Sequence, residues 1–278
     1  MPRLLVNGAS LWYEERGAGS GTVVFAHGLL WSGRMFDAQV ASLSGRYRCV
    51  TFDFRGQGRS EVTAGGYDMD TLADDAAALI EALGCAPCHF VGLSMGGFIG
   101  MRLAARRPEL IRSLVLMETS ADPEPAENVP RYRMLGGIVR ALGGLGMQLV
   151  MPKVMRIMFG RTFLADPSRE AERRLWRQRG MENDRLGVTR ALQGVIDRKP
   201  IHDELGRISA PTLVMVGDED VATVPAKAEQ MRDAIAGARL VVIPGAGHTA
   251  SVEQPDFVNS ALAEFLAAAA SPEPVARR

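Results

Sequence analysis

Residues 88–98, CHFVGLSMGGF, place a Gly-Leu-Ser-Met-Gly motif between an apolar run and a segment with helical spacing. A serine at such a junction must occupy a sharp turn with strained dihedral angles, which requires small neighbours. Gly92, Gly96 and Gly97 meet this requirement, because a residue without Cβ lets the backbone fold tightly. Free N–H groups at the start of the helix favour a negative charge beside Ser94. The motif therefore predicts a strand, a sharp turn and a helix, with Ser94 as a nucleophile.

Strand-like runs and helical segments alternate along most of the chain. Aliphatic and β-branched runs that end in Gly, Asp or Ser are typical of strands buried on both faces of a parallel sheet. The runs are RLLVNG, SLWYEER, GTVVFAHG, YRCVTFDFRG, CHFVGLSMGG, RSLVLMETS, PTLVMVGDED and ARLVVIPGAGH. Helical segments separate several of them, such as residues 70–84, which end at Gly84. This alternation predicts an α/β fold with a mostly parallel central sheet flanked by helices.

The alternation stops between residues 122 and 207. This region is rich in Met and Arg and has the pattern of helices throughout, without a run typical of a buried strand. We therefore predict a core formed by residues 1–121 and 208–270, with residues 122–207 inserted as a helical lid. Residues 271–278 are predicted to be a disordered tail.

A nucleophilic serine needs a base within hydrogen-bond reach and a third group that orients this base. The four histidines are His27, His89, His202 and His248. His248 lies on a glycine-rich loop after the last strand-like run, where a parallel sheet presents functional groups. His89 and His202 are interpreted as structural or solvent-exposed, so His248 is the predicted base.

The orienting acid is expected at the end of the preceding strand-like run, in MVGDEDVATVP. Asp218 and Asp220 are both plausible by position, and either gives the order Ser, Asp, His along the chain. Glu118, after the run LVLME, is a more distant candidate. Beside His248, the carboxylate would hold the imidazole tautomer and stabilise the imidazolium.

A further segment, VVFAHGLLW, ends a strand-like run in His27 and Gly28. The loop that follows can supply a backbone N–H group to the oxyanion that develops when a carbonyl is attacked, and the second N–H group would come from Met95. Nucleophile, acid, base and oxyanion loop thus follow four separate strands.

Composition excludes several classes of protein. Lys plus Arg and Asp plus Glu each number 32, so the formal charge is zero and a nucleic-acid partner is not expected. The N-terminal residues do not form the pattern of a signal peptide, so we expect a cytoplasmic protein. The apolar stretch at 141–152 is too short to span a bilayer and is broken by glycines, so no membrane association is expected.

Metal and redox sites are not expected either. Cys49, Cys85 and Cys88 give an odd number of cysteines, which argues against a disulfide framework. Cys85 and Cys88 form a C-x-x-C, but no second pair or H-x-x-x-H motif completes a metal site. We interpret them as small residues that enter a buried strand.

The motifs HGLL, DFRGQGRS, GLSMGG, GDEDVATVP and GAGHTASVEQP occur in this order and cover nearly the whole chain. In these motifs the chain resembles the α/β-hydrolase fold superfamily, and within it the serine esterases and lactonases related to 3-oxoadipate enol-lactonase and to the cofactor-free haloperoxidases. The resemblance implies that Ser94 is the nucleophile and His248 the base. It favours Asp220 over Asp218, because the family's acid usually lies three residues after the glycine that ends the strand, here Gly217.

The resemblance also assigns positions around the oxyanion. It places Leu29 and Met95 at the two oxyanion positions through their backbone N–H groups, and gives His27 the part of shaping that loop. Asp53 and Arg55 match a structural loop of the family, so we expect them to organise a turn rather than to catalyse.

The resulting hypothesis is a serine hydrolase that cleaves carboxylic esters or lactones through an acyl-enzyme, without a cofactor. Two alternatives use the same triad, namely perhydrolysis as in the haloperoxidases and C–C bond hydrolysis. A third alternative, of another class, is a non-catalytic ligand-binding receptor of the same fold. The expected partner is a small ester or lactone, and a homo-oligomer is left open.

The methionines of the predicted lid favour an apolar substrate pocket, because Met adapts its shape. Packing between helices is the alternative explanation for them. The candidate pocket residues are Trp31, Met134, Met151, Met155 and Met158.

Overall fold

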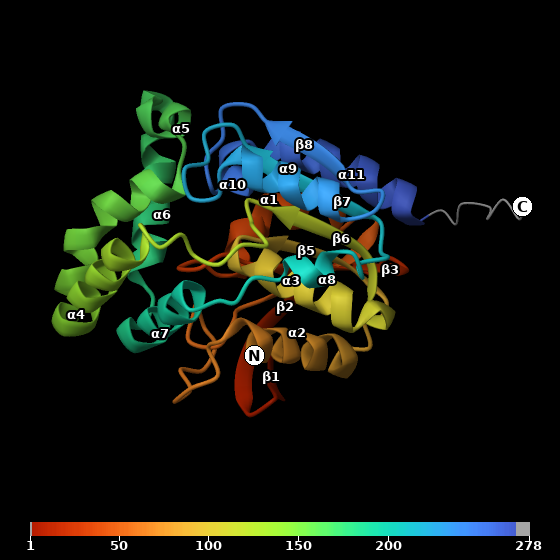
Figure 1. Ribbon diagram of the computed structural model, residues 1–278, viewed down its shortest axis with the longest axis horizontal. Helices are drawn as coiled ribbons and strands as arrows, with labels where there is room; N and C mark the ends of the chain where they lie inside the picture. The colour runs from red at the N-terminus through yellow and green to blue at the C-terminus, as the bar shows by residue number, and fades with distance from the viewer. Residues whose placement is uncertain (1, 271–278) are drawn as a thin grey trace, which may run out of the picture.

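The computed structural model describes residues 2–270 (Figure 1), so the predicted disordered tail at 271–278 lies outside the described residues. Its strands form one eight-stranded sheet in the order β1-β2-β4-β3-β5-β6-β7-β8. The first two pairings, β1 with β2 and β2 with β4, are antiparallel, and all later pairings are parallel. The strands are β1 (Arg3–Val6), β2 (Ala9–Arg16), β3 (Gly21–Ala26), β4 (Tyr47–Phe52), β5 (Cys88–Leu93), β6 (Ile111–Met117), β7 (Thr212–Gly217) and β8 (Arg239–Ile243). Each strand coincides with one of the eight predicted runs, although β2 and β6 begin one residue before their runs.

Helices cover both faces of this sheet (Figure 1). They are α1 (Asp37–Leu43), α2 (Met69–Ala82), α3 (Met95–Arg106), α4 (Val129–Met158), α5 (Arg161–Ala165), α6 (Glu170–Met181), α7 (Arg185–Ile196), α8 (His202–Leu205), α9 (Pro225–Ala234), α10 (Ala250–Glu253) and α11 (Pro255–Ala270). Single 3-10 turns lie at η1 (Gly33–Phe36), η2 (Pro108–Leu110) and η3 (Pro167–Arg169).

The hydrophobic core has two layers, one on each side of the sheet. Successive side chains of a strand point to opposite faces, so Val24 and Ala26 of β3 pack with α2, α3 and α9, whereas Val23 and Phe25 pack with α1 and α11. The central strand β5 is buried over its whole length. This burial on both faces explains why these strands have continuous rather than alternating apolar patterns.

Helices α4 to α8 all lie between β6 and β7, within the region predicted as a lid, and α4 to α6 stand beside the sheet at the left of Figure 1. Gly143 interrupts α4 with φ 57° and ψ −129°. A Cβ on Gly146 would lie 2.4 Å from the carbonyl oxygen of Ile138, eight residues earlier. In a straight helix these residues would be about 12 Å apart. The two arms of α4, residues 129–142 and 144–158, therefore lie side by side as a helical hairpin.

Among residues 2–270, α4 is the one helix whose length and mean hydropathy reach those of a membrane span. Its two arms have only 14 and 15 residues, because the chain reverses at Gly143. About 20 residues are needed to cross the hydrocarbon core of a bilayer. Neither arm is long enough to cross it.

Candidate active site

Ser94 lies between β5 and α3, with φ 52° and ψ −111°. The turn is so tight that a Cβ at any of its three glycine positions would collide with neighbouring atoms. A Cβ on Gly92 would lie 2.3 Å from the carbonyl oxygen of Gly96, and a Cβ on Gly96 would lie 2.0 Å from that of Ala26 on β3. A Cβ on Gly97 would meet a side chain at 2.6 Å. Gly92 and Gly96 are thus required by close approaches of the backbone and Gly97 by the side chain of Thr119, as the sequence indicates.

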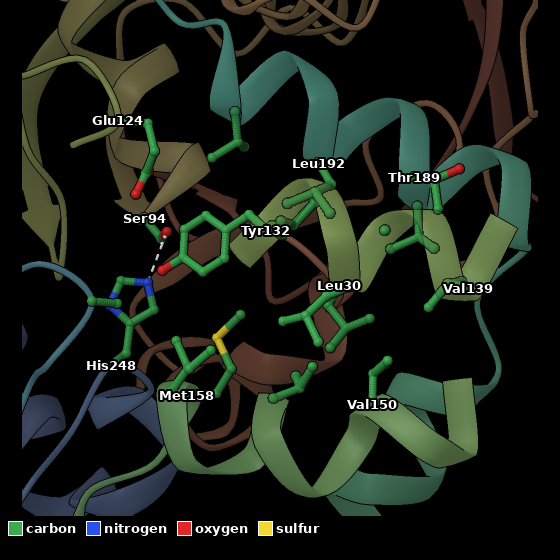
Figure 2. A pocket seen from close by; sticks show the side chains of 18 of the residues that line it. Leu30, Ser94, Glu124, Tyr132, Val139, Val150, Met158, Thr189, Leu192 and His248 are labelled. Atoms are coloured by element: carbon green, nitrogen blue, oxygen red, sulfur yellow. Dashed lines mark hydrogen bonds between the residues drawn. The ribbon is translucent and has the colours of Figure 1, made fainter. Parts of the chain in front are cut away.

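A continuous hydrogen-bond chain joins Ser94 to two loops beyond the carboxyl ends of β7 and β8 (Figure 2 shows the Ser94–His248 bond). His248 Nε2 lies 2.9 Å from Ser94 Oγ, and His248 Nδ1 lies 2.9 Å from Asp220 Oδ2. Asp220 and His248 are 3% and 4% exposed, so water competes little for these bonds. The structure thus brings together the three residues that the sequence motifs and the resemblance select.

The loop after β7 contains both Asp218 and Asp220, the two aspartates between which the sequence spacing could not decide. Asp220 also accepts hydrogen bonds from the N–H groups of Ala222 and Thr223 and from the Thr223 hydroxyl, at 2.7–3.0 Å. Burial alone would raise the pKa of Asp220, but the charge and hydrogen bond of His248 and the bonds from Thr223 hold the pKa below its ordinary value. Asp218 is exposed and accepts a bond from Gly245 N instead. Of these two aspartates, only Asp220 contacts His248.

Two further carboxyl groups are buried near Asp220. Glu118 is fully buried and, among the described residues, its carboxylate oxygens have no hydrogen-bond partner. Burial, with the nearby charges of Asp220 and Glu253, raises its pKa well above the ordinary value, which favours the neutral form of Glu118. The third candidate acid of the sequence makes no contact with the base.

Glu253 connects the histidine loop to the lid. Its carboxylate accepts hydrogen bonds from Gly247 N and Thr249 N, on either side of His248, and from Gly160 N at the end of α4, at 2.8–3.1 Å. Burial raises the pKa of Glu253 to about 7 in spite of these bonds. On the acid loop, Glu219 likewise accepts bonds from the backbone and hydroxyl of Thr162 in the lid.

The loop after β3 and the first residue of α3 face the nucleophile. In residues 2–270 the backbone N–H groups of Leu29 and Met95 make no hydrogen bond, which leaves both available to a ligand. His27 shapes the loop, because its Nδ1 lies 2.7 Å from Gly28 O and its Nε2 accepts a bond from Phe54 N at 3.0 Å. Burial lowers the pKa of His27, which keeps the ring neutral.

Gln57 and Thr223 support these groups, although neither was predicted from the sequence. Gln57 is 1% exposed, and its Oε1 accepts a bond from Leu30 N at 2.7 Å while its Nε2 faces Met95 Sδ. It thus holds the oxyanion loop against the start of α3 and supports Leu30 at φ 76°. Gln57 belongs to the motif DFRGQGRS, and this membership was the only feature of the sequence that could have pointed to its role.

Asp53 and Arg55 of the same motif organise the turn, as expected. Asp53 accepts bonds from the N–H groups of Gly33 and Arg59, both at 2.8 Å. Arg55 makes a buried two-pronged ion pair with Asp75.

An apolar cavity of about 130 Å³ reaches from Ser94 and His248 into the lid. Figure 2 shows that it lies between the two arms of α4. Tyr132 and Met158 lie near Ser94, whereas Val139 and Val150 lie at the opposite end. Its polar lining includes Glu124 and Arg198, which form a buried ion pair at 2.6 Å. Because the two charges are paired with each other, the cavity remains largely apolar.

Of the five predicted pocket residues, only Met158 lines this cavity. Trp31 instead packs edge-on against Phe159 and Trp176. Met151 and Met155 are buried in the packing of the lid, and Met134 is 51% exposed. The expectation fails for Met134, Met151 and Met155 because the hairpin, not the residue type, decides which face of α4 meets the cavity. It fails for Trp31 because its ring packs against Phe159 and Trp176.

The remaining histidines and cysteines have structural surroundings. His89 bonds Ser113 Oγ at 2.7 Å, and burial lowers its pKa to about 4. His202 lies at the surface and pairs with Asp122. Cys85 and Cys88 are buried and form no disulfide. In the part of the chain described, no three His, Cys, Asp or Glu side chains are placed to hold a metal ion.

Comparison with known proteins yields close matches over the whole fold. The alpha/beta hydrolase fold family matches residues 21–255. A putative non-heme bromoperoxidase of Mycobacterium tuberculosis (strain ATCC 25618 / H37Rv), BpoC, is 34% identical over 280 residues, covering 93% of this chain and 98% of that protein.

Two solved structures are similar throughout. A thermophilic esterase from Thermogutta terrifontis has a TM-score of 0.88 at 29% identity, covering 97% of this chain and 99% of that one. The enol-lactonase from Burkholderia xenovorans LB400 has a TM-score of 0.87 at 29% identity, covering 96% and 100%. With a sharp serine turn after β5 and a family match over most of its length, this chain belongs to the alpha/beta hydrolase fold family.

Proposed function

We propose that this protein hydrolyses carboxylic esters or lactones through an acyl-enzyme formed on Ser94. The observation that carries the proposal is the hydrogen-bond chain from Ser94 Oγ through His248 to Asp220, which faces two unpaired backbone N–H groups. These are the parts that acyl transfer requires, namely a nucleophile, a base, a group that orients the base, and donors for the oxyanion.

In the first half of the reaction, Ser94 Oγ attacks the carbonyl carbon of the ester while His248 Nε2 takes the serine proton. The carbonyl oxygen becomes an oxyanion and accepts hydrogen bonds from the N–H groups of Leu29 and Met95. When the intermediate collapses, the C–O bond to the leaving group breaks and the imidazolium returns its proton to that oxygen. The alcohol departs from an ester, whereas in a lactone it stays attached to the acyl group.

In the second half, water replaces the alcohol. His248 Nε2 takes a proton from the water as its oxygen attacks the acyl carbon, and the same backbone N–H groups stabilise the second oxyanion. The bond to Ser94 Oγ then breaks, and the proton passes from His248 to this oxygen. Asp220 stays ionised throughout, because its pKa is held below the ordinary value, and it stabilises each imidazolium.

The cavity supports an apolar acyl group of modest length. Its volume of about 130 Å³ is close to that of an engineered cavity of about 150 Å³ that binds benzene. Acyl groups of about four to eight carbons should therefore be preferred over acetate and over dodecanoate.

Initial rates on p-nitrophenyl esters from acetate to dodecanoate, together with lactones, test this proposal. Turnover should peak at intermediate chain length and be lost in Ser94→Ala. Wild-type protein that turns over neither esters nor lactones, but binds them as tightly as Ser94→Ala does, would instead indicate a ligand-binding receptor.

Perhydrolysis is a second candidate, favoured by the similarity to a protein named as a putative non-heme bromoperoxidase. Hydrogen peroxide would replace water as the attacking group, so that the acyl-enzyme releases a peracid. Peracid formed from acetate or butyrate with hydrogen peroxide, and absent in Ser94→Ala, would support this activity.

A further inference from the structure

The reversal of α4 produces a surface that the catalytic site does not use. We define the lid tip as the Gly143–Gly144 turn together with Leu142, Leu145 and Leu149. The cavity runs along the hairpin, with Tyr132 and Met158 near Ser94 and with Val139 and Val150 toward the turn (Figure 2). The lid tip is thus at the end of the hairpin farthest from the nucleophile.

The lid tip is strongly apolar and exposed. Leu142, Leu145 and Leu149 are 50%, 58% and 61% exposed. Leu145 and Leu149 are one helical turn apart and project from the same face. Single exposed leucines are ordinary on protein surfaces, but three within eight residues at a projecting turn form a patch that indicates an interaction.

The surroundings of this patch are basic. Helix α4 contains Arg131, Arg133, Arg140, Lys153 and Arg156 and no acidic residue. All five are exposed, and among the described residues only Arg133 makes a salt bridge, with Asp197 at 3.6 Å. Arg140 lies two residues before Leu142, and Lys153 follows Leu149 by one helical turn, so positive charge flanks the leucines on both arms.

We propose that the lid tip docks on the surface of an anionic lipid bilayer, with Leu142, Leu145 and Leu149 in the interface and with Arg140 and Lys153 at the headgroups. An apolar face bordered by basic residues is the combination that binds such surfaces, because buried apolar area and attraction to anionic lipids act together. Each arm is too short to span, so the lid tip enters the interface without crossing the bilayer. A second copy of the chain fits less well, because pairing two lid tips would bring like charges together.

This inference departs from the expectation of no membrane association. That expectation rested on the 141–152 stretch being too short and too rich in glycine to span a bilayer. The glycines do prevent spanning, but Gly143 also creates the turn that exposes the leucines.

Sedimentation with vesicles tests the proposal. Wild-type protein should bind vesicles of phosphatidylcholine mixed with phosphatidylglycerol, bind pure phosphatidylcholine vesicles more weakly, and lose binding as salt is raised. The double change Leu145→Asp with Leu149→Asp should lower the partition coefficient about tenfold or more. Arg140→Gln with Lys153→Gln should lower it about tenfold on anionic vesicles only.

A matched control is Leu175→Asp on α6, where Leu175 is 43% exposed but lies outside the lid tip. This variant should bind vesicles as wild type does, and every variant should keep its turnover of a soluble short-chain ester, which shows that it is folded. Wild-type protein that stays in the supernatant, or that binds equally with and without anionic lipid, would overturn the proposal. A concentration-dependent dimer that is lost in the double leucine variant, without vesicle binding, would assign the patch to a second copy.

Discussion

Replacing Ser94 by glycine should give a protein more stable than the Ser94→Ala variant, although neither variant turns over esters. Both changes remove the hydroxyl and its hydrogen bond to His248, so their difference reports on the Cβ alone. At φ 52° and ψ −111° the backbone of Ser94 is in a region that side chains disfavour, and alanine keeps this strain whereas glycine removes it.

The size of the difference follows from two opposing effects. A non-glycine residue in such a conformation costs about 1–3 kcal/mol. Glycine removes this strain but itself lowers stability by about 0.5–1 kcal/mol, because it has more conformational freedom in the unfolded chain. Taking the middle of both ranges, the net advantage of Ser94→Gly over Ser94→Ala should be about 1.3 kcal/mol, which is about 2 °C in Tm for a chain of this length.

Thermal and urea unfolding of the two variants measure this difference. As a control, Ala78→Gly in the interior of α2 should lower stability by about 1 kcal/mol, because helix interiors disfavour glycine. If Ser94→Gly unfolds at the same temperature as Ser94→Ala or below it, the serine turn stores no strain and the reasoning fails.

Three further predictions concern the carboxyl groups. Asp220→Asn should lower kcat on esters by about 10³–10⁴-fold, whereas the exposed Asp218→Asn should change it little; equal losses in the two would refute the assignment of the acid. Glu118→Gln should flatten the pH dependence of stability above about pH 4.5. The pKa of Glu118 is raised in the folded protein, so the carboxyl group ionises first in the unfolded chain and the wild type loses stability as the pH rises above the ordinary value of 4.5. Urea unfolding of both proteins across this pH range should show the difference. Glu253→Gln should lower the free energy of unfolding by about 1–3 kcal/mol, because an amide cannot accept hydrogen bonds at both of its ends; urea unfolding that matches wild type would contradict this.

The strands and the serine turn could be predicted because their constraints are local. A parallel strand that is buried on both faces must be apolar throughout, as in β5, and the turn at Ser94 needs glycine wherever backbone atoms approach within about 3 Å of a Cβ. The positions of His248 and of the loop after β3 followed from the rule that loops at the carboxyl ends of parallel strands meet, whereas Leu29 itself was assigned by the resemblance.

The lining of the cavity could not be predicted, because it depends on packing between distant segments. The inward face of α4 is set by the reversal at Gly143, and a helical pattern alone does not show that a glycine has positive φ. Gln57 and Thr223 were not predicted for a related reason, because a polar side chain that supports a loop follows no regular sequence pattern. The unpaired Glu118 is apparent only when its surroundings are known.

The bonds from Glu253 to the histidine loop and to Gly160 bear on how this protein could be redesigned. Exchanging the lid for that of a relative is an obvious route to a new substrate range, since the insertion begins and ends at neighbouring strands. Here such a graft would also remove the backbone N–H group of Gly160, which donates to the same Glu253 carboxylate as Gly247 and Thr249 beside His248. A transplanted lid would need to supply an equivalent N–H group, or the recipient would gain a new pocket and lose the placement of its histidine.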